Sequence, residues 1–157
     1  MTFQRTRDWA LVKWIATHPM IWPNITDDFA PEPADWKPRT DEEIIYLIAR
    51  DGDEVLGMFI FFPDNPVCWD VHVCMLPSAW GPRSLAAFLE MFQWVWANTN
   101  CMRIVGAVPK WNRRAALFAL KAGMECFGIN RKSHKKYGTL HDMALFGVSK
   151  PGEKEAA

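Results

Sequence analysis

Two apolar runs on either side of a short polar turn constrain this 157-residue chain more than any other feature of its sequence. The runs cover residues 44–49 and 55–62, and the turn between them contains an Asp-Gly pair. Such a pair between two apolar runs is a strong hairpin signal, because glycine accepts the positive φ of tight hairpin turns. We therefore predict two antiparallel strands here.

A third strand is predicted over residues 67–76, after a turn with two prolines. Side chains alternate between the two faces of a strand. Asp70, His72 and Cys74 would therefore share one face, while Trp69, Val71, Val73 and Met75 would share the other.

Helical spacing predicts the elements that cover this sheet. Apolar residues recur at intervals of three and four over residues 85–96, and Ser84 could cap that helix. Further helices are predicted over 8–17, over part of 20–28, and from Asn112 to 122, and short strands over 103–108, 126–130 and 142–148. The fold class is thus mixed α/β (α+β), with one domain over residues 1–149, a mostly antiparallel sheet flanked by helices, and a flexible tail over 150–157.

Composition disfavours several kinds of partner. Lys plus Arg and Asp plus Glu each total 18, which leaves no excess positive charge for nucleic acid. No stretch approaches the roughly 20 apolar residues that span a bilayer, and no signal peptide precedes the domain, so we expect a cytoplasmic protein without membrane contact. The four cysteines lack CxxC spacing and only four histidines are present, so we expect reduced, buried thiols and no metal site.

Three ordered segments carry a resemblance to a known family. A strand ending at Pro77 runs into a loop with Gly81 and a helix; a short strand over 104–109 follows; and a helix then begins with Asn112-Arg-Arg-Ala115 and is followed by Gly123-Met124. This set resembles the GNAT (acyl-CoA N-acyltransferase) fold, and in particular the small GNAT-like proteins encoded by bacteriophages. The resemblance covers residues 44–148 and implies a sheet that splays in its middle.

The resemblance also implies acetyl-CoA as co-substrate. Its pyrophosphate would lie at the helix N-terminus after the loop, where backbone N–H groups and the helix dipole favour an anion, and its pantetheine arm would pair with the splayed strand. The residues implied in binding acetyl-CoA are Val73, Met75, Leu76, Gly81, Arg83, Ser84, Leu85, Asn112 and Ala115. Asn112 as a plain helix cap and Gly81 as an ordinary turn glycine are the alternatives.

Asp70 and His72 are the candidate catalytic residues. Direct transfer of an acetyl group to an amine needs a base near the thioester, and these two side chains lie on one strand face, about 6 to 7 Å apart by strand rise. Structural roles, with Asp70 paired to an arginine and His72 bonded within the sheet, are the alternative.

The chain departs from the family pattern in two places. Pro82, Arg83 and Ser84 stand where further loop glycines are usual, and Ala119 stands where a proton-donating tyrosine is common. A second hypothesis therefore stays open, a GNAT-like phage protein without catalysis that serves in the virion, in assembly or in host interaction. The sequence leaves open whether the acceptor amine belongs to a small molecule or to a protein. It also leaves open whether the protein forms a homodimer.

Four tryptophans fall in predicted loops or at helix starts. They are Trp22, Trp36, Trp80 and Trp111. An aromatic side chain is hard to bury fully at such positions, so we expect these residues to line an acceptor pocket or a protein interface.

Overall fold

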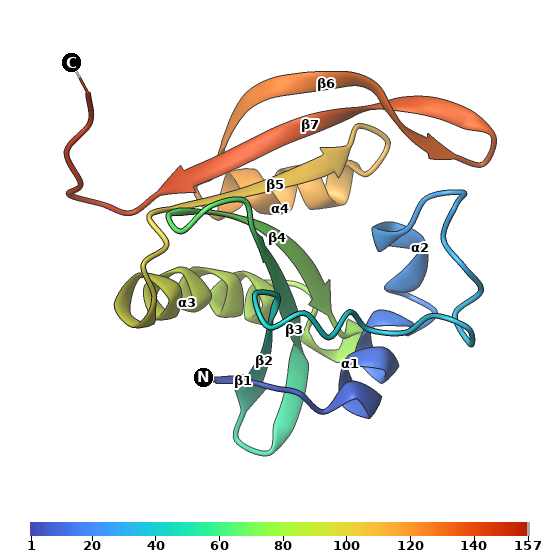
Figure 1. The fold of residues 1–157 in the computed structure, drawn as a ribbon, viewed down its shortest axis with the longest axis horizontal. Helices are drawn as coiled ribbons and strands as arrows, with labels where there is room; N and C mark the ends of the chain where they lie inside the picture. Colours follow the sequence, from blue (N-terminus) through green and yellow to red (C-terminus); the bar gives the residue numbers. More distant parts are fainter. Residues whose placement is uncertain (157) are drawn as a thin grey trace.

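The computed structural model describes residues 1–156 and is built around one seven-stranded sheet (Figure 1). The strands lie in the order β1-β2-β3-β4-β5-β7-β6, and all neighbours are antiparallel except β4 and β5. The strands are β1 (Thr2–Arg5), β2 (Ile45–Asp51), β3 (Glu54–Pro63), β4 (Cys68–Met75), β5 (Arg103–Pro109), β6 (Glu125–Lys136) and β7 (Thr139–Ser149).

Helices cover both faces of the sheet. In Figure 1, α3 and α1 lie on opposite sides of β2 to β4, and α4 lies against β5 and β7. The helices are α1 (Trp9–Ala16), α2 (Trp22–Ile25), the 3-10 turn η1 (Pro77–Ala79), α3 (Pro82–Asn98) and α4 (Arg113–Lys121). The predicted fold class, a mostly antiparallel sheet flanked by helices, is confirmed.

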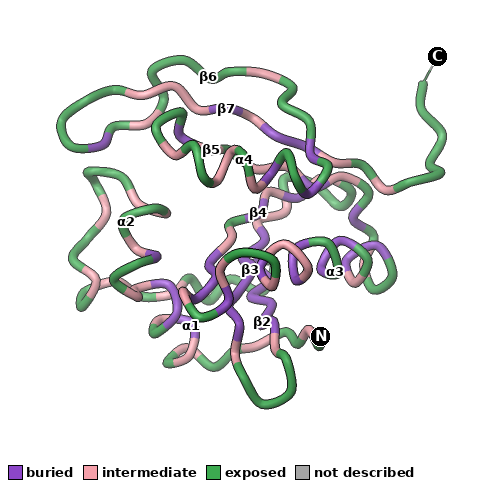
Figure 2. Tube along the Cα trace, turned by 180° about the vertical axis from the view of Figure 1, so that it is seen from behind, coloured by how far each residue is buried: buried purple, intermediate pink, exposed green. Residues whose placement is uncertain are grey.

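Strand alternation divides the core into two clusters. Along β2, Ile45, Leu47 and Ala49 pack with α3 and α4, whereas Tyr46 and Ile48 pack with Val12, Ile15 and Ala16 of α1. The predicted faces of β4 hold as well, since Trp69, Val71 and Met75 belong to the α3 side and Cys74 to the α1 side. Figure 2 shows this burial concentrated in β2 to β4 and α3.

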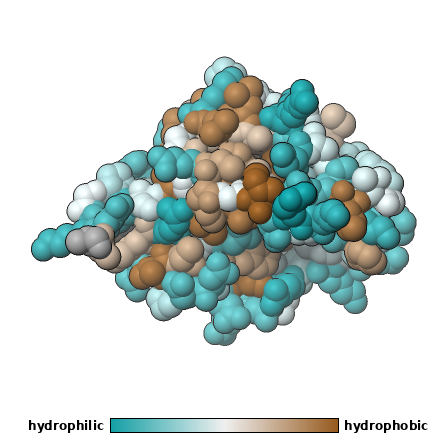
Figure 3. Space-filling model, turned by 90° about the horizontal axis from the view of Figure 1, so that it is seen from above, coloured by the Kyte–Doolittle hydropathy of each residue, from teal (hydrophilic) through white to brown (hydrophobic). Residues whose placement is uncertain are grey.

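The predicted hairpin is present, with β2 and β3 joined by a turn in which Gly52 has a φ of 57°. The sheet also contains β1, an edge strand that the sequence did not indicate, and a β6 that is longer than the predicted 126–130. β6 is mostly exposed, and Figure 3, which looks down on β6 and β7, shows apolar side chains scattered among polar ones.

Three local expectations need correction or restriction. Ser84 does not cap α3, because Gly81 is the N-cap residue and the Ser84 hydroxyl donates to the carbonyl of Ala79 at 2.7 Å. Cys126 is exposed rather than buried, although Cys74 and Cys101 are buried, and burial raises the pKa of Cys74 to about 12. Residues 150–156 form no helix or strand and leave the sheet as a tail, and Ala157 lies outside the described residues.

Between residues 1 and 156, the structure contains no helix that is both long and apolar enough to cross a membrane.

Candidate functional site

The sheet opens between β4 and β5. These two parallel strands pair over only three positions, from Cys68 opposite Arg103 to Asp70 opposite Val105, and the pairing does not continue beyond them. The strands diverge from there on, as the resemblance implied. Residues 71–75 of β4 and 106–109 of β5 therefore face a gap within the sheet.

A cavity of about 750 Å³ occupies this gap and extends on both sides of it. That volume lies within the range of small-molecule sites, roughly 300–1,000 Å³. Its walls come from α2 and the loop after it, β2 to β7, and the N-terminal ends of α3 and α4. Of the predicted site residues, His72, Val73, Met75, Gly81, Ser84, Asn112 and Ala115 line it.

The N-terminus of α3 opens at one end of the cavity. Gly81 has a φ of 93° and a ψ of −137°, a backbone conformation that glycine adopts without steric cost, and the helix starts at Pro82. The first N–H that bonds within the helix is that of Leu85, to the carbonyl of Gly81 at 3.2 Å. The N–H groups of Arg83 and Ser84, in the first turn, have no intrahelical acceptor. This end of α3 can hold an anion.

The N-terminus of α4 lies at the same end of the cavity. The Asn112 side chain accepts a hydrogen bond from the N–H of Ala115 at 3.1 Å, so the predicted cap is confirmed. The Arg114 guanidinium lies 5.0 Å from the centre of the Trp80 ring, which links the start of α4 to the loop before α3. Two helix N-termini and one arginine therefore border the same opening.

The backbone of β4 presents its free groups to the gap. The N–H of Leu76 donates to the carbonyl of Leu56 on β3 at 2.9 Å, so by alternation the backbone groups of Val73 and Met75 point away from β3. The Met75 carbonyl accepts a bond from the Trp80 indole N–H at 2.8 Å. The Leu76 side chain packs in the α1-side core and does not line the cavity.

Asp70 and His72 meet on one face of β4, as predicted. Their Oδ2 and Nε2 atoms lie 3.3 Å apart, with side chains 31% and 45% exposed. His72 lines the cavity and packs edge-on against Phe62 at 5.1 Å between ring centres, whereas Asp70 stands behind it, outside the lining. The imidazole therefore reaches the cavity with a carboxylate at one of its nitrogens.

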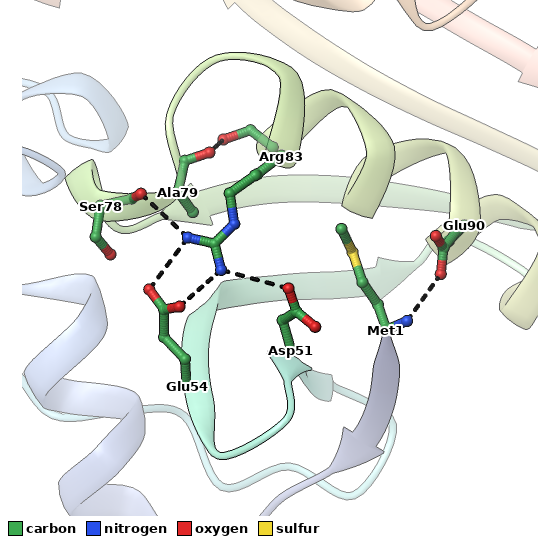
Figure 4. A network of polar contacts seen from close by, with 8 residues as sticks. Met1, Asp51, Glu54, Ser78, Ala79, Arg83 and Glu90 are labelled. Atoms are coloured by element: carbon green, nitrogen blue, oxygen red, sulfur yellow. Dashed lines mark hydrogen bonds and ion pairs between the residues drawn. The ribbon is translucent and has the colours of Figure 1, made fainter.

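Besides Asp70 and Leu76, the side chains of Arg83 and Leu85 do not line the cavity. The Arg83 guanidinium is held by Glu54 at 2.7 Å and Asp51 at 3.5 Å, on the β2–β3 hairpin (Figure 4). The hydrogen bond from Arg83 lowers the pKa of Glu54. Leu85 packs against the α3-side core. Arg83 can therefore contribute its backbone N–H, but not its guanidinium, to an anion bound at the helix N-terminus.

The predicted loop tryptophans mostly face the cavity. Trp22, Trp36 and Trp80 line it, and Trp111 does not. Trp22 and Trp36 contact each other edge to face, with 5.8 Å between ring centres. Their position in proline-rich loops was the only signal of this role in the sequence.

The sequence-based site residues did not include several polar residues of the lining, among them Tyr46 and His134. Tyr46 donates its hydroxyl hydrogen to the Arg39 carbonyl at 2.8 Å, and burial raises its pKa. His134, on β6, has a buried Nε2 without a hydrogen-bond partner, and burial lowers its pKa. Neither residue belongs to a motif, and β6 bulges between Asn130 and His134, so counting along the strand does not reveal which residues face inward.

Metal ligands do not cluster in the part of the chain that the structure describes, where no group of three or more His, Cys, Asp or Glu side chains could hold an ion.

No protein-family model matches the sequence, and no curated protein is similar to it in sequence. Solved structures match throughout the fold. One is a spermidine N-acetyltransferase from Vibrio cholerae in complex with CoA and spermine, at a TM-score of 0.77 and 10% identity over 95% of each chain. Another is a ribosomal-protein-S5-alanine acetyltransferase from Vibrio fischeri, at 0.71 and 14% identity over 99% of this chain and 97% of that one.

A GNAT-family acetyltransferase from Streptococcus pneumoniae also matches, at a TM-score of 0.59 and 18% identity over 70% of this chain and 69% of that one. This chain has the GNAT fold. The resemblance stated from its motifs is thereby confirmed at the level of fold, with the gap between β4 and β5 and the glycine-led start of α3 as its local signs.

Proposed function

We propose that this protein is an acetyl-CoA-dependent N-acetyltransferase. The observation that carries the proposal is one cavity at the β4–β5 splay, bordered by two helix N-termini at one end and by His72 within it. Fold alone does not establish activity, because one fold hosts many functions, so the residues of this site carry the proposal.

The residues at the splay fit coenzyme A. The N–H groups of Arg83 and Ser84 suit the pyrophosphate, and Gly81 lets the backbone approach it without a side chain in the way. The backbone groups of Val73 and the N–H of Met75 suit the amides of a pantetheine arm laid along β4. Asn112 and Ala115 would border the same ligand from α4. The Vibrio cholerae neighbour, solved with CoA, is consistent with this fit.

Bound acetyl-CoA supplies an activated acetyl group. His72 is the proposed general base: with its Nε2–H directed at Asp70, the lone pair of Nδ1 is free to take a proton from the amine. Asp70 is the proposed positioning residue, since it holds the imidazole in that tautomer. As the amine nitrogen bonds to the acetyl carbon, the carbon–sulfur bond breaks and the sulfur leaves as a thiolate. The thiolate takes up a proton from water, which balances the proton that the amine gives to His72. The products are an amide and the free thiol.

Titration calorimetry with acetyl-CoA tests the proposal. We expect micromolar binding by the wild-type protein and at least a hundredfold loss in Gly81→Glu, which places a carboxylate where the pyrophosphate would lie. Gly152→Glu is the matched control, because Gly152 also has a left-handed φ, 81°, but lies in the tail beyond the sheet.

The acetyltransferase proposal and the hypothesis without catalysis predict different results in this titration. Binding that is unaffected by Gly81→Glu would contradict the proposed site. No heat and no thermal stabilisation at millimolar acetyl-CoA would instead favour the second hypothesis, a GNAT-shaped component without catalysis.

A further inference from the structure

We name the part of the cavity on the α1 side of the sheet the acceptor chamber. It is lined by Trp22, Ile25, Trp36, Tyr46, Phe62 and His134, from α2, the loop after it, β2, β3 and β6. Five of these six side chains are rings. An aromatic wall of this kind offers a large apolar contact area with little loss of side-chain freedom.

Few charges face the cavity. Among the described residues that line it, Asp27 is the sole carboxylate. Of the two lining arginines, Arg39 is paired with Asp41 at 3.1 Å, and Arg114 lies over Trp80. A substrate with several positive charges would lack partners here, and an anionic substrate would gain little, because unpaired charge is costly to move out of water.

Hydrogen bonds between distant segments join two walls of the chamber. The Asp28 carboxylate accepts bonds from the N–H groups of Tyr137 at 2.7 Å and Gly138 at 2.8 Å. The Asp28 N–H donates to the carbonyl of Lys135 at 3.0 Å. Lys136 adds a bond from Nζ to the Thr26 carbonyl at 2.8 Å. Figures 1 and 2 both show the loop after α2 beneath the tip of the β6–β7 hairpin.

These bonds limit what can enter. Thr26 and Asp27 line the cavity from one side and His134 lines it from the other, and the bonds join Thr26 and Asp28 to residues 135–138. A polypeptide lying across this end would have to break them. A small molecule contained within the chamber would not.

From the ring lining, the scarcity of charge and the joined walls, we propose that the acceptor is a small primary amine with one aromatic group. The proposal rests on the acetyltransferase function above and names its substrate class. The aromatic group lies against the Trp22–Trp36 pair and Phe62, and the amine points toward His72, which packs against Phe62. Acetylation then proceeds as described, with the proton of the amine passing to His72.

A panel of three amines tests the proposal. With acetyl-CoA as donor, release of the CoA thiol is measured for 2-phenylethylamine, for spermidine and for a short peptide with an N-terminal alanine. We expect kcat/KM for 2-phenylethylamine to exceed both others by at least tenfold. A preference for spermidine or the peptide would overturn the proposal.

Two variants locate the aromatic group. We expect Trp36→Ala to lower kcat/KM for 2-phenylethylamine at least tenfold while the Kd for acetyl-CoA stays unchanged, and Trp36→Phe to recover most of the loss. Trp14→Ala, at an exposed tryptophan of α1 outside the lining, is the control and should change kcat/KM less than twofold. Equal loss in both alanine variants would overturn the placement.

Binding measurements separate this proposal from the function on which it rests. Saturation-transfer NMR detects 2-phenylethylamine on the protein, and calorimetry detects acetyl-CoA independently. If acetyl-CoA does not bind, the acetyltransferase function fails. If acetyl-CoA binds but 2-phenylethylamine neither binds nor raises thiol release above the amine-free rate, the proposed acceptor class alone is overturned.

Discussion

The two ends of the cavity are built in different ways. The cofactor end consists of backbone groups at the starts of α3 and α4, each set within a few residues of chain by Gly81 or Asn112. The acceptor chamber consists of side chains from five separate elements, and its walls are joined by bonds between residues about 110 positions apart, such as Gly138 and Asp28. Under the proposed function, binding of the co-substrate would need only local geometry, whereas selection of an acceptor would depend on long-range packing.

The largest expected effect falls where the two ends meet. His72→Gln should lower kcat about a hundredfold or more, because a positioned general base contributes roughly 10² to 10⁴ in rate. Acetyl-CoA affinity should stay unchanged in calorimetry, since His72 lies on the α1 side of β4. Asp70→Asn should act less strongly and shift the pH profile of kcat, as a positioning residue would.

His141→Gln, on β7 outside the lining, serves as the control and should keep full kcat. A kcat in His72→Gln within threefold of wild type would remove His72 from the mechanism.

The second effect concerns the bonds that join the chamber walls. Hydrogen bonds from the backbone N–H of Gly138, and then of Tyr137, lower the pKa of Asp28. Asp28→Asn replaces one accepting oxygen by an N–H₂ group, so hydrogen exchange at the Tyr137 and Gly138 amides should quicken about tenfold. Asp142→Asn is the matched control: Asp142 accepts through one oxygen only, from the N–H of Lys132 at 2.9 Å, so the asparagine oxygen can keep that bond and exchange at Gly138 should stay unchanged.

The same bonds predict a pH dependence. The folded-state pKa of Asp28 is lowered. The ionised carboxylate therefore stabilises the contact with the β6–β7 hairpin fully above the unfolded-state pKa of about 4, and this stabilisation is lost as the pH falls through the folded-state pKa. Exchange at Gly138, corrected for intrinsic rates, should therefore rise below about pH 4 in the wild type and stay level in Asp28→Asn. The positive charges of Lys135 and Lys136 also lower the pKa of Asp28.

The third effect concerns the cofactor end. Asn112→Ala removes the cap of α4 and should lower the free energy of unfolding by about 1 kcal/mol, as for other helix caps. If Asn112 also borders the bound ligand, acetyl-CoA affinity should fall severalfold, whereas a plain cap would change stability alone. Denaturant unfolding and calorimetry on one sample separate the two roles. Asn112→Asp, which keeps the capping oxygen, should restore stability.

The smallest effect is expected at Arg83. Its guanidinium is engaged by Glu54 and Asp51 in an exposed network, and such surface pairs contribute little to stability. Arg83→Ala should weaken acetyl-CoA binding less than threefold, because its backbone N–H is retained. A larger loss would mean that the guanidinium leaves Glu54 to bind a phosphate.

Local patterns were sufficient to predict much of this protein. The Asp-Gly turn, the alternation along β4, the spacing along α3 and the Asn112 cap each depend on neighbours within about four residues, and all four are present in the structure. The meeting of Asp70 with His72 follows from the same two-residue strand period.

Tertiary structure alone decided the rest. Arg83 binds Glu54, 29 residues away, and Gly138 binds Asp28, 110 residues away. No spacing in the sequence encodes such contacts, and none shows that His134 lines the cavity. The bulges of β6 also interrupt its alternation, so its inward side chains cannot be counted from the sequence. The sequence by itself thus determined most of the strands, the helices and the helix starts of the cofactor end, because residue periodicity and helix capping depend on neighbouring residues. The acceptor chamber was decided by packing between distant segments, because its walls come together only in the folded chain.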